Sequence, residues 1–82
     1  MSPRSIRSGQ LLKEARERMG YSQLEVATLV GIQIRQYQRF EGGERAISKA
    51  NLKLGLIVCK VLEIDPYELV FGDDLQFFYK EK

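Results

Sequence analysis

Glycine residues divide this chain into segments of helix length, and their spacing constrains the fold more than any other feature. Gly20, Gly31, the pair at 42–43 and Gly72 each follow a stretch whose apolar side chains recur with helical periodicity. Because glycine readily adopts the left-handed backbone that ends a helix, these positions predict helix ends. The predicted helices span about 9–19, 23–30, 33–41, 51–62 and 66–71. The sequence therefore predicts an all-α protein, a compact five-helix bundle.

Two of these helices begin with characteristic capping residues. In the stretch 22–25, the Ser22 hydroxyl is placed to accept from the Glu25 amide, and the Glu25 carboxylate reaches back to the Ser22 amide. Asp65 precedes Pro66, and proline is favoured at the first position of a helix. The 23–30 segment makes only about two helical turns, too few to persist alone in water. It must therefore pack against neighbouring helices.

Composition excludes several classes of function. The chain has 82 residues, enough for one domain, with no His and a single Cys, Cys59. It therefore has neither a Ser-His-Asp triad nor an imidazole metal site, and one Cys forms no internal disulfide or Cys-rich zinc site. No apolar run reaches the roughly 18 residues of a membrane span. We expect no enzyme activity, no metal or cofactor, no small-molecule ligand, no membrane partner and a cytoplasmic location.

Charge is distributed unevenly along the chain. Residues 1–49 carry nine basic and five acidic side chains, a net +4, whereas residues 50–82 carry four basic and six acidic ones, a net −2. The first part is therefore the candidate partner of an anionic polymer. Its 33–41 segment is rich in Arg and Gln, which form paired hydrogen bonds with guanine and adenine edges. Taken alone, such Arg side chains are more often ordinary solvated charges.

The two short helices at 23–30 and 33–41 have the outline of a helix-turn-helix, since a tight turn at Gly31 joins them. The residues from Leu12 to Leu69 resemble the phage lambda repressor and Cro type of DNA-binding domain, also called the Xre family. The resemblance rests on Leu12, Arg16, Met19-Gly20-Tyr21-Ser22-Gln23, Glu25-Val26-Ala27, Val30-Gly31-Ile32, Tyr37, Phe40-Glu41, Gly43, Leu62, Ile64-Asp65-Pro66 and Glu68-Leu69. It covers residues 12–69, or 58 of 82.

The resemblance implies roles for individual residues. In this family the second helix of the motif enters the major groove, led by its N-terminal residues. The base-reading positions that it implies are Gln33, Ile34, Arg35, Gln36 and Arg39. Phosphate contacts are expected from Gln23, Arg45, Arg7, Gln38 and Gly43. The family often pairs an Arg of the first helix with a Glu that ends the reading helix, and Arg16 and Glu41 match this structural ion pair.

The sequence departs from the family pattern at three places. Gln33 stands where a Ser or Thr commonly caps the reading helix. Ile34 stands where a polar base reader is common, and it either touches a thymine methyl group or packs locally. The span from Glu41 to Leu62 is a few residues longer than usual, so that either Ser48 or Asn51 is placed to cap the helix ending at Leu62.

The ends of the chain are assigned to separate segments. Residues 1–8 contain Pro3 and several Ser, which predicts an irregular basic arm; residues 9–72 form the DNA-binding domain; residues 73–82 form an aromatic tail that is more strand-like than helical. The 51–62 helix is apolar around most of its circumference and needs cover on more than one side. Either the tail folds over this helix, or both form a dimer interface, the preferred hypothesis. That interface would contain Leu54, Ile57, Val61, Leu75, Phe77, Phe78 and Tyr79.

Two functions are compatible with these features. The first is a sequence-specific transcriptional regulator, of the repressor or controller type, that binds double-stranded DNA as a homodimer on a palindromic operator. The alternative is an antitoxin or adaptor whose main role is to bind a partner protein through the 51–62 helix and the tail.

Overall fold

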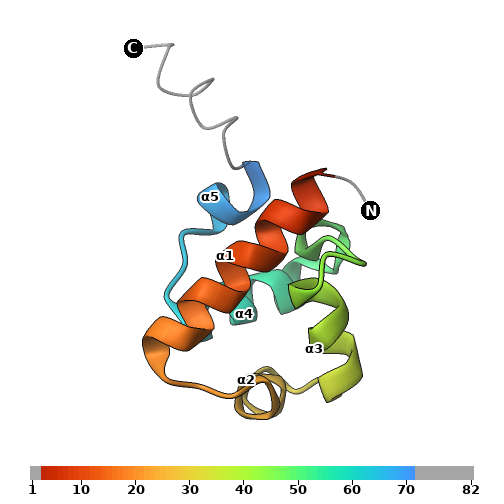
Figure 1. Ribbon diagram of the computed structural model, residues 1–82. Coiled ribbons are helices and arrows are strands. Elements are labelled where there is room, and N and C mark those ends of the chain that lie inside the picture. The colour runs from red at the N-terminus through yellow and green to blue at the C-terminus, as the bar shows by residue number, and fades with distance from the viewer. Residues whose placement is uncertain (1–2, 72–82) are drawn as a thin grey trace.

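Five α-helices and one short 3₁₀-helix make up the part of the chain that the computed structural model describes, residues 3–71 (Figure 1). They are α1 Pro3–Met19, α2 Gln23–Val30, α3 Ile34–Glu41, η1 Ile47–Lys49, α4 Leu52–Leu62 and α5 Pro66–Phe71. The prediction of an all-α, five-helix fold is confirmed. The tail residues Leu75, Phe77, Phe78 and Tyr79, for which a strand-like segment was predicted, lie outside the described residues.

The predicted caps form. The Ser22 amide donates to Glu25 Oε1 at 2.8 Å, and the Glu25 amide donates to Ser22 Oγ at 3.0 Å, which completes the capping box of α2. Asn51, rather than Ser48, caps α4, since its Oδ1 accepts from the Leu54 amide at 2.7 Å. The Tyr67 amide donates to Asp65 Oδ1 at 2.9 Å at the start of α5. These side chains satisfy amides that have no partner inside the helix.

The start of α1 corrects the prediction of an irregular arm, because the helix begins at Pro3 rather than near residue 9. Proline is compatible with this position, since the first helical amides have no intrahelical acceptor. Ser8 and Gly9 are buried, and a Cβ atom on Gly9 would overlap the main-chain carbonyl oxygens of Phe40 and Glu41. The α1 backbone therefore crosses the end of α3 directly, and this contact supports the first turns of α1.

We expect Gly9→Ala to destabilise the protein by about 1–3 kcal/mol, because the new methyl group forces α1 and α3 apart. The matched control is Gly55→Ala in α4, where a Cβ would meet no atom within 4 Å. That change should stabilise the helix by about 0.5–1 kcal/mol through the better helix propensity of alanine. Urea unfolding of both variants measures the difference, and equal midpoints would contradict the close crossing.

A single apolar core joins the helices, with α1 lying across α3 and α4, and α2 packing on α3 and α4 (Figure 1). Tyr37 and Phe40 are its largest buried side chains, as predicted for core residues of α3. The other buried core residues are Leu12, Ala15, Val26, Ala27, Val30, Ile47, Leu54, Val58, Cys59, Leu62 and Leu69. Burial raises the pKa of the Cys59 thiol, consistent with a packed side chain rather than a reactive one.

The apolar side chains of α4 are placed differently from the prediction. Leu54, assigned to the dimer interface, is buried in the core, and Ile57 and Val61 are partly buried against it. Leu52 and Leu56 are instead exposed, at 77% and 49% of their surface. The reason is that α4 packs against α1 and α2 with the side that carries Leu54 and Val58. Among residues 3–71, the apolar face of α4 that is left exposed is therefore the one that carries Leu52 and Leu56.

Candidate nucleic-acid interface

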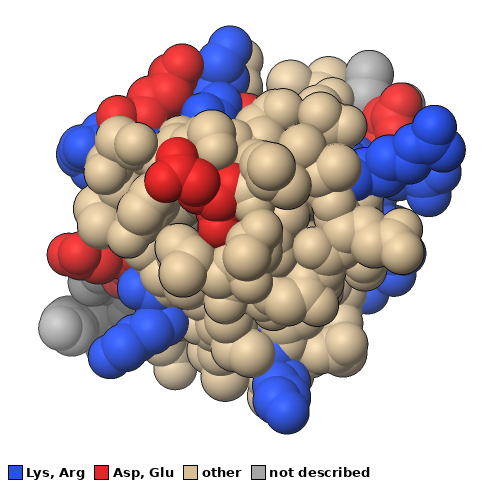
Figure 2. Space-filling view, turned by 90° about the horizontal axis from the view of Figure 1, so that it is seen from below, with Lys and Arg blue, Asp and Glu red and all other residues tan. Residues whose placement is uncertain are grey.

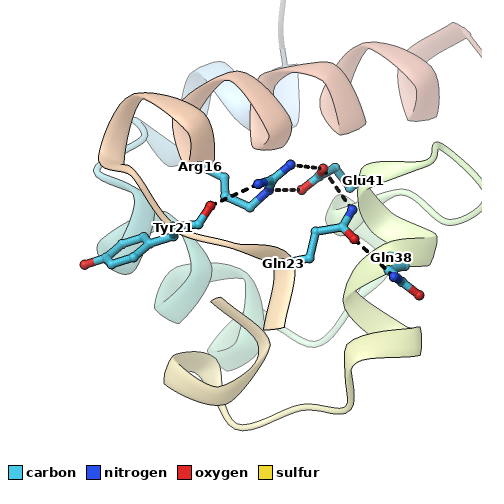
Figure 3. Close-up of polar contacts among 5 residues, drawn as sticks. All are labelled: Arg16, Tyr21, Gln23, Gln38 and Glu41. Carbon is cyan, nitrogen blue, oxygen red and sulfur yellow. Dashed lines mark hydrogen bonds and ion pairs between the residues drawn. The ribbon is translucent and has the colours of Figure 1, made fainter. Parts of the chain in front are cut away.

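A hydrogen-bonded ion pair fixes α1 to α3 beneath the candidate interface. Arg16 Nε donates to Glu41 Oε2 and Arg16 Nη2 donates to Glu41 Oε1, both at 2.9 Å (Figure 3). Arg16 Nη1 donates to the carbonyl oxygen of Tyr21, also at 2.9 Å. The Glu41 side chain is only 4% exposed and that of Arg16 13%. The predicted structural ion pair is therefore confirmed, and it also holds the loop between α1 and α2.

Two glutamine side chains extend this pair to the surface. Gln23 Nε2 donates to Glu41 Oε1 at 3.1 Å, while Gln23 Oε1 accepts from Gln38 Nε2 at 3.1 Å (Figure 3). The structure thus brings together two residues that were predicted separately as phosphate contacts. Because the Gln23 oxygen accepts from Gln38, the Gln38 amide is held by the first residue of α2. A hydrogen-bonded network of four side chains therefore links α1, α2 and α3.

The pKa of Glu41 is held below its ordinary value of 4.5. Burial by itself would raise this pKa, but the interactions with Arg16, Tyr37 and Gln23 favour the charged form and outweigh burial. A carboxyl whose folded pKa is depressed contributes stability that is present above its unfolded pKa. That contribution is lost as the pH falls through the folded pKa.

We therefore expect the wild-type chain to lose stability as the pH falls below about 4.5. Glu41→Gln should be less stable at pH 7, and its stability should depend less on pH in this acid range. Urea unfolding at a series of pH values between 7 and 3 measures both slopes. Parallel curves for the two proteins would show that Glu41 does not carry this dependence.

The outer face of α3 presents the predicted base readers to solvent. Gln33, Arg35, Gln36 and Arg39 are exposed, while Tyr37 and Phe40 fill the opposite, buried face. Gln33 is the N-cap and makes no side-chain cap hydrogen bond, as its departure from Ser or Thr suggested. Ile34 is partly buried against the core, which supports local packing over base contact. Arg35, Gln36 and Arg39 are therefore predicted readers whose side chains the fold exposes on α3.

The other three residues that were predicted to contact phosphates lie in three different settings. Arg45 is exposed, with its guanidinium 5.9 Å from the centre of the Phe40 ring. The Gly43 amide already donates to the Phe40 carbonyl at 3.3 Å, and Gly43 is buried with φ at 81° beside Ile6, so it offers no amide to a phosphate. Its role is to turn the chain under α1. Arg7 lies within α1, partly exposed, rather than in a separate arm.

The charge pattern of this end of the molecule is visible from below, the side on which α2 lies. Figure 2 shows Lys and Arg side chains around the rim of this face, on the side of α3 and on other sides, with acidic side chains near its centre. Basic side chains at a rim suit phosphate contacts, which position a protein while base contacts specify its site.

Comparison with known proteins agrees with this geometry. The helix-turn-helix family model HTH_3 matches residues 12–69. The chain belongs to this helix-turn-helix family. It thereby joins the DNA-binding regulators of transcription of the lambda repressor and Cro type, with α2 and α3 as the motif. The resemblance seen in the sequence is confirmed over the same residues.

Among solved structures, the chain is similar to the restriction-modification controller protein C.AhdI from Aeromonas hydrophila. The two are 33% identical with a TM-score of 0.67, and the match covers 78% of this chain and 92% of that one. Comparison with curated proteins gave no match. Within the described residues, no helix is long and apolar enough to cross a membrane, and no cluster of acidic or Cys side chains is arranged to hold a metal ion.

Sequence reasoning missed two contacts that shape this interface. Gly9 lies inside a helical pattern, where nothing in the sequence marks it as the crossing point of α1 and α3. Glu44 follows the glycine pair, and only the folded loop places its carboxylate beside Arg39, at 4.0 Å from Nε.

Proposed function

We propose that this helix-turn-helix protein is a sequence-specific transcriptional regulator that binds double-stranded DNA as a homodimer on a palindromic operator. The observation that carries the proposal is the exposed Arg35–Gln36–Arg39 face of α3, held by a buried ion pair to α1. Paired donors at fixed positions on a rigid helix are what base reading in the major groove needs. The proposal places its action in the cytoplasm, with DNA as partner.

The proposed docking mode follows from the placement of the two motif helices. The N-terminal part of α3 enters the major groove, so that Arg35 and Gln36 lead and Arg39 follows one turn later. Phosphate contacts come from Arg45 and from the Gln23–Gln38 pair at the start of α2, where helix amides favour an anion. The buried pair of Arg16 and Glu41 orients the helices and does not touch DNA.

An exposed apolar face supports the homodimer. Tyr67 and Phe71 stack with their ring centres 6.2 Å apart, and Leu52, Leu56 and Val70 flank them. Five such side chains on one face exceed the scattered apolar residues of an ordinary surface. In Figure 1, α5 lies at the end of the molecule away from α2. Pairing two copies through this face would leave both reading helices free, as two half-sites about one DNA turn apart require.

We expect Leu56→Glu to weaken the homodimer by at least about tenfold, because the interface would bury an unpaired carboxylate. The matched control is Leu29→Glu in α2, an equally exposed leucine outside this face. Sedimentation at a series of concentrations measures both dissociation constants. If Leu29→Glu weakens the dimer and Leu56→Glu does not, the assigned face is wrong.

The similarity to C.AhdI supports a controller of restriction-modification as the biological class, since the match covers almost all of that chain. Selection from random duplex DNA tests the molecular function directly. A recovered palindrome supports the proposal, and recovery without a common motif contradicts it.

A second function, an adaptor that binds another protein, is favoured by the same apolar face of α4 and α5. Light scattering of the pure chain separates the two. A stable homodimer supports the regulator, whereas a chain that stays monomeric at micromolar concentration supports the adaptor.

A further inference from the structure

An acidic side chain stands inside the basic surface of α3. Glu44 Oε2 lies 4.0 Å from Arg39 Nε, and the two side chains are 67% and 65% exposed. Exposed ion pairs of this length contribute little to folding stability. A carboxylate at the rim of a surface that faces DNA also repels phosphates. Neither folding stability nor affinity for DNA of any sequence therefore explains why an acidic residue occupies this position.

The main chain, not the side-chain pair, fixes Glu44 at this place. The Glu44 and Arg45 amides both donate to the Arg39 carbonyl, at 3.0 and 3.2 Å. The Gly42 amide donates to the Gln38 carbonyl at 2.8 Å, and Gly43 turns the chain with φ at 81°. The loop is thus folded back onto the last turn of α3. These main-chain hydrogen bonds place Glu44 beside the Arg39 side chain.

The recess around this pair contains the polar groups of a reading surface. It is lined by Arg35, Gln38, Arg39, Gly42 and Glu44. An arginine reads guanine through two of its five N–H groups, but the same fork binds a phosphate equally well. Glu44 approaches the Nε side of Arg39, which leaves the terminal amino groups for another partner. A phosphate at that partner position would lie close to the Glu44 carboxylate, whereas a neutral base edge would not be repelled.

We propose that Glu44 is a positioning residue that restricts Arg39 to base reading and disfavours its use as a phosphate contact. This inference rests on the proposed function. Repulsion by Glu44 lowers the affinity for all DNA. The affinity is lowered less for a duplex in which Arg39 meets the correct base, because Glu44 holds Arg39 for base reading. The result is a higher ratio of specific to non-specific binding, because specificity is a difference between two affinities.

The test compares wild type with Glu44→Gln on three duplexes at several salt concentrations. The duplexes are the selected site, the same site altered at the base pair that Arg39→Ala ceases to discriminate, and a random sequence. We expect Glu44→Gln to bind the random duplex several-fold more tightly and to discriminate that one base pair about tenfold less. The slope of log K against log salt on random DNA should steepen by about one, for one added phosphate contact.

Two controls make the result specific. Glu14→Gln removes the same charge from the exposed surface of α1 and should leave base discrimination unchanged. In the Arg39→Ala background, Glu44→Gln should no longer alter discrimination, because the residue that it positions is absent. Equal effects of Glu44→Gln on all duplexes, or an effect on base preference that persists without Arg39, would overturn the inference. A wild-type chain without sequence preference would overturn the proposed function and this inference with it.

Discussion

Arg16→Ala is expected to lower the free energy of unfolding by about 3–5 kcal/mol. The change leaves the Glu41 carboxylate almost fully buried without its counter-charge, and it also removes the donor to the Tyr21 carbonyl. Burying an unpaired charge costs far more than a surface ion pair contributes. Urea unfolding at pH 7 measures the loss.

The matched control is Arg18→Ala, an exposed arginine on the same helix. It should change stability by no more than about 0.5 kcal/mol. The double variant Arg16→Met with Glu41→Leu should recover part of the loss, since an apolar pair of similar volume removes the buried charges together. If Arg16→Ala and Arg18→Ala destabilise equally, the ion pair does not hold α1 to α3.

Arg35→Ala is expected to weaken binding to the selected duplex by about 1–3 kcal/mol, or roughly 5- to 150-fold, and to relax preference at one base pair of each half-site. Arg35 is exposed near the N-terminus of α3, and it lines the recess beside Gln38 and Arg39. A guanidinium that forms two hydrogen bonds with a base edge leaves that edge unpaired when it is removed. Fluorescence anisotropy with the selected duplex and its single-base variants measures both effects.

Arg18→Ala again serves as control, because it removes the same charge from α1. It should weaken all duplexes slightly and alike, without a change in base preference. If Arg35→Ala shows that same uniform pattern, Arg35 is a phosphate contact rather than a base reader.

Local sequence features determined which helices form and where most of them end. The capping box at Ser22 and Glu25, Asn51 before α4 and Asp65 before Pro66 act through neighbouring amides, so their effects are visible without a partner segment. The start of α1 was missed because its first turns are supported by contact with the end of α3, which no local pattern shows.

The tertiary structure decided which surfaces are left for function. Leucines occur all around α4 in the sequence, and only the choice of the side that faces the core buries Leu54 and exposes Leu56. The Gly43 amide donates to the Phe40 carbonyl within the folded loop after α3. Gln38 of α3 donates to Gln23 of α2, so this contact joins two separate helices. The sequence by itself determined the helix-turn-helix and the Arg and Gln side chains of its reading face, because both depend on short-range spacing. The partners of those side chains depend on how the helices meet, and there the tertiary structure was decisive.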